Sequence, residues 1–543
     1  MVHFGLFPPL VTCASAAYVQ WQHCDDHTPG LPAFIPESLS ASLVPVDDTH
    51  DRLSLRIGRW LEESECARWA AEIMSVNIDF DMLGHSSSHH HKVNATCQRL
   101  ALESNLFILS LTATEDTDAF YALSTFHTAI HLVGPNAEEK GCLQANITPA
   151  FSPAIQATLR YAPLTILVFV LLVGIARSVS DSSTSTEAWA RAVLPGFADC
   201  LQYLQSIFLT GSLSLFYPGF YQPVVSRLGW VSLFADGSIT HSRTYAGIND
   251  GIYELNGTYG GTFGLELMTQ IVGAPMTMDT WLNMVILIMA IAALAALCLE
   301  IYWLMNRPVG ADTGLRRTFN RTLHMILSYF MLPLIALSFY QIDNASYLPS
   351  YHIFLAALLL AIILIAFVWL LSQIPTRSLG VLIFDSRRRY NQIITSETSD
   401  GQHKSFVLAL FVLLFIRGAA IGGLQISGQA QLAVLGACEL VLLACIVQFQ
   451  AYNMLSTGTI SAVARLGSLI CMIMLIPGVA SDTTRSAIGY LILLIHGCVL
   501  VFGFLVPAMI QLGKLCSHWW NRPTPRVDVR SLGSTILQSS CKR

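Results

Sequence analysis

Two charged residues lie inside apolar stretches that are suited to a membrane interior. Arg417 and Glu439 each lie about eleven positions from a turn centred near Gly428, which places both roughly 16 Å below the turn in an antiparallel pair of helices. Pairing costs less free energy than leaving either charge bare in a low dielectric. The spacing therefore predicts an Arg417–Glu439 ion pair, which either staples a hairpin or lines a permeation path. Glycines leave room for close packing of the first helix: Gly418, Gly422 and Gly423.

A second set of polar residues forms a stripe further toward the N-terminus. Asp199, Gln202 and Gln205 follow one another at intervals of three, with Ser206 and Thr210 close by. Residues three or four positions apart share one face of a helix. A polar stripe on a membrane helix must face other protein or water. It is therefore either the lining of a transport pathway or a polar seam between helices.

Other unusual residues of the apolar segments have simpler interpretations. Arg465 and Glu300 are expected near the cytosolic ends of their helices, where a long side chain reaches the membrane surface. Pro333 and Pro507 predict kinks, because proline removes a backbone hydrogen bond and clashes with the preceding turn. Neither feature identifies a function.

The composition indicates a membrane protein. Only 12% of the 543 residues are charged, 53% are hydrophobic, and the mean hydropathy is +0.54. Soluble globular chains carry about a quarter charged residues. No nucleophile elbow, P-loop, CxxC pair or dinucleotide fingerprint occurs, so an enzyme is the least favoured class, and no cofactor, metal ion or nucleic-acid partner is expected.

Apolar segments of spanning length occur at nine positions after residue 158. We expect these segments to form a mainly α-helical, nine-span bundle over residues 159–515, followed by a short tail at 516–543. The predicted spans are Leu159–Ala176, Val193–Phe216, Asp279–Leu304, Arg321–Ile342, Tyr351–Gln373, Phe406–Leu424, Ala430–Gln450, Gly458–Pro477 and Ala487–Leu512.

Two signals predict the orientation of the bundle. Basic residues concentrate in alternate loops, which the positive-inside rule places in the cytosol; these are Arg307, Arg316, Arg317, Arg321, Arg377, Arg387, Arg388, Arg389, Lys404, Lys514, Arg522 and Arg526. Glycosylation sequons fall in segments on the other side, at Asn94, Asn146, Asn256 and Asn344. A fifth, at Asn320, is on the cytosolic side and should be unused. We therefore predict that the N-terminus lies in the lumen or outside the cell and that the C-terminus lies in the cytosol.

The first 158 residues have a different character. Residues 1–17 resemble a cleaved signal peptide that ends in small residues. Residues 18–158, called the head below, hold 18 acidic against 7 basic residues. Alternating segments such as RLSLRIGRW predict strands of a small β-sandwich, whereas ECARWAAEIM could be helical. Four cysteines in an exported domain predict two disulfides of open connectivity: Cys24, Cys66, Cys97 and Cys142.

Histidines in the head do not form a convincing metal site. GHSSSHHH, at residues 84–91, is expected to be a flexible loop, because a metal needs ligands held in fixed geometry. His127 and His131 have the i, i+4 spacing of a helix but lack the glutamate of an HExxH motif. The glycine-rich YAGINDGIYELNGTYGGTFG reads as a flexible loop between the second and third spans.

Three stretches resemble the fungal TRP-like ion channel family, also called flavin carriers. LQYLQSIFLTGSLSLFYPGFYQPVVSRLGWVSLF is similar to its second span and the following Tyr-Pro and Trp segment. ISGQAQLAVLGACELVLL is similar to a late span, and CLQANITPAFSPAIQATLRYAPLTILV to the junction between head and first span. The resemblance covers most of residues 142–515.

The resemblance implies an ML-like β-sandwich head, related to lipid-recognition folds, above a TRP-like bundle. It favours a calcium-permeable cation channel in ion homeostasis or cell-wall maintenance. The alternatives are a carrier of FAD into the endoplasmic reticulum and a non-transporting, lipid-binding membrane organiser. The head lacks much of the family's cysteine pattern. Membrane lipid is an expected partner, homo-oligomer formation stays open, and the endoplasmic reticulum, vacuole and plasma membrane are all candidate locations.

Overall fold

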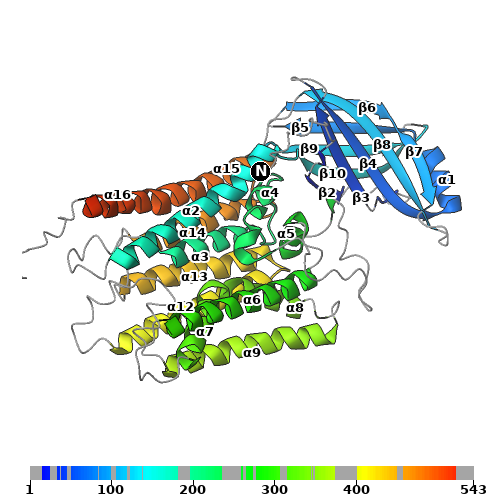
Figure 1. Cartoon of the computed structure of the whole chain (residues 1–543). Coiled ribbons are helices and arrows are strands. Elements are labelled where there is room, and N and C mark those ends of the chain that lie inside the picture. Colours follow the sequence, from blue (N-terminus) through cyan, green and yellow to red (C-terminus); the bar gives the residue numbers. More distant parts are fainter. Residues whose placement is uncertain are drawn as a thin grey trace, which may run out of the picture.

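A computed structural model describes most of the head and the helical bundle. The described residues are 15–16, 18–24, 34–36, 38–45, 50–82, 85–99, 106–118, 123–136, 138–180, 196–234, 258–260, 264–272, 277–305, 315–343, 345, 349–373, 400–448 and 456–520. The head lies at one end of the bundle, beside α4, α5 and the start of α15 (Figure 1). The first fourteen residues of the predicted signal peptide and most of the predicted tail lie outside these ranges.

The head consists of two sheets. The five-stranded sheet has the order β1 (Ser15–Ala16), β3 (Ser38–Pro45), β4 (His50–Glu62), β8 (Leu106–Asp118) and β7 (Asn94–Arg99). The six-stranded sheet has the order β11 (Thr258–Gly260), β2 (Tyr18–His23), β10 (Glu139–Thr148), β9 (Phe126–Val133), β5 (Ser75–Met82) and β6 (His85–Lys92). All pairings are antiparallel except that of β11 with β2.

Period-two patterning explains the sandwich. In β9, FHTAIHLV, each second residue is buried, so Phe126, Ile130 and Leu132 face the core while His127 and His131 face outward. Buried residues from both sheets form one hydrophobic core. ECARWAAEIM is largely helical: α1 (Glu63–Glu72) buries Cys66 and Trp69 against the sandwich.

The loop prediction for the histidine run is wrong, and the one for the glycine-rich segment is tested only at its few described residues. Residues of GHSSSHHH from His85 onward form the edge strand β6, because the segment pairs with all of β5 from Met82↔His85 to Ser75↔Lys92. His127 and His131 lie on a strand, where an even spacing also brings two side chains to one face. Part of the glycine-rich loop also forms a strand, β11, which adds to the head's own sheet. β1 lies within the predicted signal peptide and pairs with β3.

Six helices in the described residues are long and apolar enough to cross a membrane, as in a multi-pass membrane protein. They are α2 (Pro153–Ser180), α6 (Thr277–Met305), α9 (Ser350–Gln373), α13 (Gly428–Gln448), α14 (Thr457–Met472) with η6 (Ile473–Leu475), and α15 (Asp482–Cys498) continued by η7 (Val499–Leu505) and α16 (Val506–Trp520). Figure 1 shows them running side by side.

The other three predicted spans correspond to shorter or interrupted helices. α3 (Phe197–Thr210) is about 21 Å long at 1.5 Å per residue, and nine of its fourteen residues are buried. α12 (Asp400–Gly423) has an apolar part of only Leu408–Gly423. The predicted span Arg321–Ile342 is divided into α7 (Leu315–Tyr329) and α8 (Met331–Asp343). Between α3 and α6 lie α4 (Tyr221–Ser226), η3 (Gly229–Ser232) and α5 (Gly264–Val272).

Both predicted proline positions coincide with irregular helix. Pro333 cannot donate to the carbonyl of Tyr329, four residues earlier, and the helix breaks at Phe330. Pro507 is the second residue of α16 and lies two positions after the π-helical segment η7, a segment type that is a known cause of helix irregularity. Both irregularities therefore lie next to a proline, which lacks a backbone N–H.

The glycines of α12 serve a different neighbour from the one expected. A Cβ on Gly422 would lie 1.8 Å from the carbonyl oxygen of Ala336, and one on Gly418 would lie 2.7 Å from Ile335. Both contacts are with α8, not with α13. Close approach of α8 and α12 therefore depends on these two glycines.

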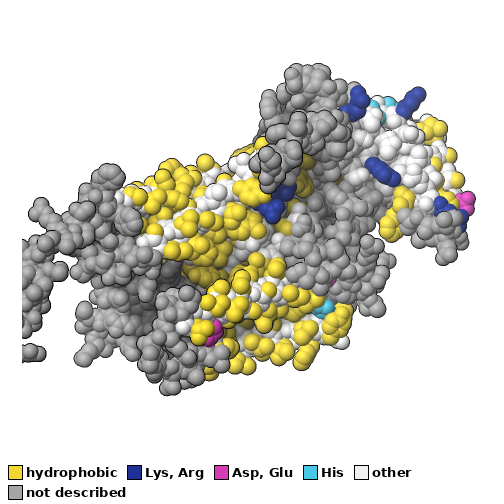
Figure 2. All heavy atoms as spheres, in the orientation of Figure 1, with side chains coloured by type: hydrophobic (Ala, Val, Ile, Leu, Met, Phe, Trp, Pro, Cys, Tyr) yellow, Lys and Arg dark blue, Asp and Glu magenta, His cyan; other side chains and the backbone are white. Residues whose placement is uncertain are grey.

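The outside of the bundle is apolar. Large hydrophobic side chains are exposed along several helices, among them Leu172, Leu294, Ile365 and Phe502 at 50% or more. Figure 2 shows hydrophobic side chains covering much of the described, visible face of the bundle, whereas the Lys and Arg side chains coloured in this view lie mainly on the head. An exposed apolar surface of this extent suits contact with lipid.

Candidate functional site

Three charged side chains meet in the interior of the bundle. Arg465 of α14 contacts both carboxylate oxygens of Glu439 on α13, with Nε 2.9 Å from Oε1 and Nη2 3.3 Å from Oε2. Arg417 of α12 places Nη2 3.1 Å from the same Oε1. Glu439 is 3% exposed. Two guanidinium groups therefore share one buried carboxylate, and we call these residues the Arg–Glu–Arg cluster.

The two arginines are not equivalent partners. Arg465 approaches Glu439 with the two-point geometry that makes Arg–carboxylate pairs strong. The Nε and Nη2 atoms of Arg417 find no hydrogen-bond acceptor in favourable geometry among the described residues, although Nη2 lies close to the carboxylate. The predicted contact between Arg417 and Glu439 is present, but the stronger pair is formed by Arg465.

The prediction for Arg465 was wrong. It was expected at a helix end, where its side chain would reach the membrane surface, yet it lies at the level of Glu439. Residue 452 is the midpoint of the sequence between α13 and α14, and Glu439 and Arg465 are each about thirteen positions from it. Counting residues from the connection between two helices predicted that Arg417 and Glu439 lie at the same depth. The same count from the connection between α13 and α14 is a sequence signal for the Glu439–Arg465 pair.

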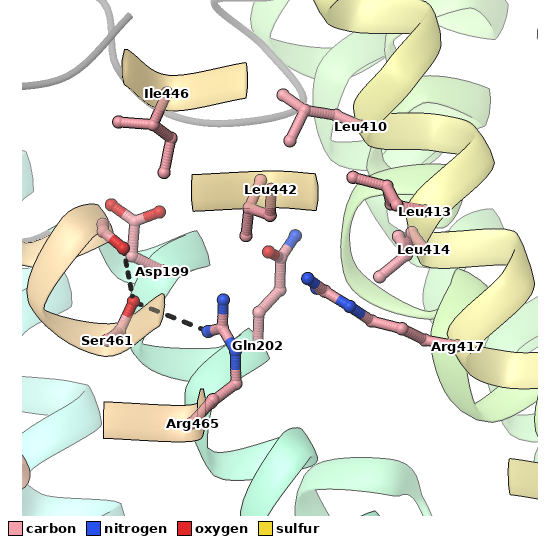
Figure 3. A pocket seen from close by; sticks show the side chains of 11 residues that line it. Asp199, Gln202, Leu410, Leu413, Leu414, Arg417, Leu442, Ile446, Ser461 and Arg465 are labelled. Carbon is pink, nitrogen blue, oxygen red and sulfur yellow. Dashed lines mark hydrogen bonds between the residues drawn. The ribbon is translucent and has the colours of Figure 1, made fainter. Parts of the chain in front are cut away.

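Most of the predicted stripe on α3 faces the cluster. Asp199 and Gln202 line a cavity of about 50 Å³ together with Arg417, Ser461 and Arg465. Figure 3 shows the Gln202 side chain lying between those of Arg417 and Arg465. Gln202 also donates to the carbonyl of Ser328 on α7. The distal cavity, as we call this space, is farther from the head.

A second cavity lies on the head side of the same arginines. It has a volume of about 60 Å³ and is lined by Gln202, Ser206 and Thr210 of α3 together with the Arg–Glu–Arg cluster. We call it the proximal cavity. Gln202, Leu414, Arg417 and Arg465 border both cavities. The cluster therefore stands between two cavities that follow the stripe of α3.

The charges around the cavities balance. Arg417 and Arg465 bring two positive charges, and Glu439 and Asp199 bring two carboxylates, with Asp199 close enough for its charge to act on Arg465. Balanced charge lowers the cost of burying these groups. The site as a whole therefore carries no formal surplus that would hold a counter-ion permanently.

Gln205 does not belong to the cavity lining. It is 1% exposed, and its Nε2 donates to the carbonyl oxygens of Val231 (3.0 Å) and Tyr329 (2.7 Å). The carbonyl of Tyr329 is the one that Pro333 leaves without a helical donor. Gln205 therefore satisfies the backbone at the break between α7 and α8, which is a structural role.

A buried polar pair that the sequence did not reveal joins α3 to α15. The hydroxyl of Tyr203 on α3 lies 3.0 Å from Nδ1 of His496, and both residues are less than 5% exposed. His496 lies three residues before η7. A histidine and a tyrosine separated by 293 positions carry no local signal, so only the packed bundle brings them together.

The predicted extracytosolic residues divide into several groups. Disulfides join Cys24 to Cys142 and Cys66 to Cys97. Asn94 is exposed at the start of β7. Asn146 lies within β10, where its Oδ1 is 2.8 Å from Nδ1 of His127, and the Thr148 of its sequon is 0% exposed. Two predicted glycosylation sites lie outside the described residues, at Asn256 and Asn344.

One group of potential ligand atoms occurs in the described part of the head. Nδ1 of His131 lies 2.7 Å from Oε1 of Glu139, and Cys142 is nearby. The sulfur of Cys142 is bonded to Cys24, so it is not available as a thiolate ligand. His131 and Glu139 are better described as an exposed hydrogen-bonded pair.

A scan against protein-family models and searches of curated proteins and solved structures found no match to this chain.

Proposed function

We propose that the chain is a TRP-like membrane transport protein that conducts cations, calcium among them, along the polar face of α3. The observation that carries the proposal is the pair of cavities that adjoin the Arg–Glu–Arg cluster inside an apolar bundle. Ionisable residues at membrane depth are costly and are typical of transport pathways.

The size of the cavities favours an ion over a large solute. A water molecule needs roughly 10–15 Å³ of such volume, so cavities of about 50 and 60 Å³ hold roughly four or five waters each. Sites for drug-sized ligands usually measure about 300–1,000 Å³. A partly hydrated metal ion fits this space, whereas a flavin dinucleotide would need a much wider conformation.

The charged residues suggest how such a pathway is closed. Arg417 and Arg465 border both cavities and are tied to one carboxylate, so the Arg–Glu–Arg cluster acts as the constriction of this conformation. Separation of Arg417 from Glu439 would join the cavities. Arg417 is the arginine to move, because Arg465 holds the carboxylate at two points. The carboxylates of Asp199 and Glu439 would then face the passing cation.

The proposed topology has nine spans with the head outside and the C-terminus in the cytosol. The six membrane-length helices, together with α3, α7–α8 and α12, supply the nine segments. The two disulfides and the exposed sequon at Asn94 support an extracytosolic head. A glycan on Asn94 together with cytosolic labelling of a cysteine near Arg387 would support this orientation, and the reverse pattern would overturn it.

Reconstitution into liposomes tests the proposed activity. Purified protein should release or admit calcium, and Asp199→Asn should lower the initial flux by about tenfold or more, since a unit charge within about 10 Å of the ion contributes about 1.4 kcal/mol or more at an effective dielectric near 20. Glu65→Gln, which removes an exposed charge on α1, is the matched control and should leave the flux unchanged. If the wild type shows no calcium flux but takes up labelled FAD, the FAD carrier replaces the proposal. If it shows neither flux nor uptake but binds lipid, the lipid-binding membrane organiser replaces it.

A further inference from the structure

The loop between α3 and α4 connects the proximal cavity to the surface that the head occupies. Thr210, the last residue of α3, lines the proximal cavity. The hydroxyl of Tyr217 donates to the carbonyl oxygen of Thr210 over 2.5 Å, and the Tyr217 ring stacks on Tyr221 at a centroid distance of 5.1 Å. Movement of this loop, residues 216–220, therefore acts directly on the end of α3.

The head rests on the same loop at Gly219. A Cβ added at Gly219 would lie 2.5 Å from Oγ1 of Thr148 and 2.9 Å from Cγ2 of Thr125. The two threonine hydroxyls are 2.8 Å apart and come from the end of β10 and the residue before β9. The head thus abuts the backbone of the loop at a point where only glycine leaves room.

The bundle holds the loop from the other side. Phe220 stacks on Tyr490 of α15 with centroids 4.2 Å apart, and the Tyr490 hydroxyl donates to the carbonyl oxygen of Leu123 in the head at 2.7 Å. The backbone N–H of Phe216 donates to the carbonyl of Leu475 at 3.0 Å. The loop is therefore in contact with the head, α15 and α3 at once.

Packing at the interface between the head and the bundle is incomplete. A cavity of about 60 Å³ lies between the head residues Asp81, His127 and Asn146 and the bundle residues Asp482 and Arg485. Its walls are polar on both sides, so water can fill it. This space allows a small displacement of the head without separating apolar surfaces.

We propose that the 216–220 loop couples the position of the head to the proximal cavity. A displacement of the head moves the Gly219 backbone, the loop carries Tyr217 with it, and Tyr217 shifts the Thr210 turn that lines the cavity. The expected effect on calcium flux rests on the proposed transport function. The mechanical coupling between the head and the proximal cavity can be measured without any flux.

The experiment uses thiol labelling of Thr210→Cys in the full-length protein, with the modified peptide identified by mass spectrometry. Gly219→Ala adds a Cβ that clashes with Thr148 and Thr125 and so displaces the head from the loop. This variant should change the labelling rate at Thr210→Cys by at least threefold. Adding Thr148→Ala removes the nearest atom of the clash and should return the rate toward the starting value. Gly513→Ala, where an added Cβ meets nothing within 4 Å, is the matched control.

Tyr217→Phe distinguishes coupling from general disruption. This variant removes only the hydrogen bond to Thr210, so Gly219→Ala should have no further effect on labelling in its background. Equal rates in wild type and Gly219→Ala, or an undiminished Gly219→Ala effect in the Tyr217→Phe background, would overturn the coupling. If Gly219→Ala does not fold, an unchanged rate in Tyr217→Phe alone overturns it. Calcium flux in the same variants should follow the labelling, and absence of flux in the wild type would refute only the proposed function.

Discussion

Replacement of Glu439 by Gln should destabilise the bundle more than removal of either arginine. Glu439 is 3% exposed and lies 2.9 Å from Arg465 and 3.1 Å from Arg417. Glutamine keeps the shape of the side chain but leaves two buried guanidinium groups of like charge beside each other. Breaking a buried ion pair by removing one partner costs about 3–5 kcal/mol.

The expected change is large enough to measure in detergent. At roughly 2 °C per kcal/mol for a large domain, Glu439→Gln should lower the apparent Tm by about 6–10 °C. Arg417→Met should lower it by no more than about 2–4 °C, because Arg465 still neutralises the carboxylate. Arg465→Met should cost more than Arg417→Met, because it removes a contact to both oxygens.

Two results would contradict the roles assigned to these three charged residues. An unchanged Tm in Glu439→Gln would mean that the cluster contributes little. A greater loss in Arg417→Met than in Arg465→Met would mean that the two arginines are ranked wrongly. Exchange of charges, Arg417→Glu with Glu439→Arg, should not restore stability, because the introduced arginine would face Arg465.

The remaining predictions concern packing and modification. Gly422→Ala should force α8 and α12 apart and lower the apparent Tm by about 2–6 °C, at a cost of about 1–3 kcal/mol, whereas Gly436→Ala, whose Cβ meets nothing within 4 Å, should not. Gln205→Leu should lower the Tm by about 2–6 °C, because each carbonyl left without a donor costs about 1–3 kcal/mol, and no change would show that these carbonyls find other donors. Asn94→Gln should remove a glycosidase-sensitive mass shift and Asn146→Gln should not, as intact mass spectrometry would reveal.

The sequence was most informative where the physical constraint was local. Period-two alternation predicted the strand β4 from RLSLRIGRW, and Pro333 predicted the break that separates α7 from α8. Depth counting brought Arg417 to Glu439, because a hairpin turn fixes the relative height of two helices. The stripe of α3 was also visible, apart from Gln205, which faces the break instead of the cavities.

The sequence was least informative where neighbours far along the chain decide the structure. The histidine run looked like a loop, but pairing with β5 makes it a strand. The glycines of α12 carried no indication that their partner is α8 instead of α13. The contact between Tyr203 and His496 depends on how α3 and α15 pack, which no local pattern encodes.

The proposed function requires that the polar face of α3 lines an ion pathway. The most direct test is calcium flux through reconstituted Ser206→Cys protein before and after a cationic thiol reagent, with Ile207→Cys as control. Ser206 lines the proximal cavity, whereas Ile207 is 3% exposed and does not line it. We predict that the reagent blocks flux in Ser206→Cys and leaves Ile207→Cys and the wild type unchanged. Calcium flux that persists after complete modification of Ser206→Cys would contradict the claim.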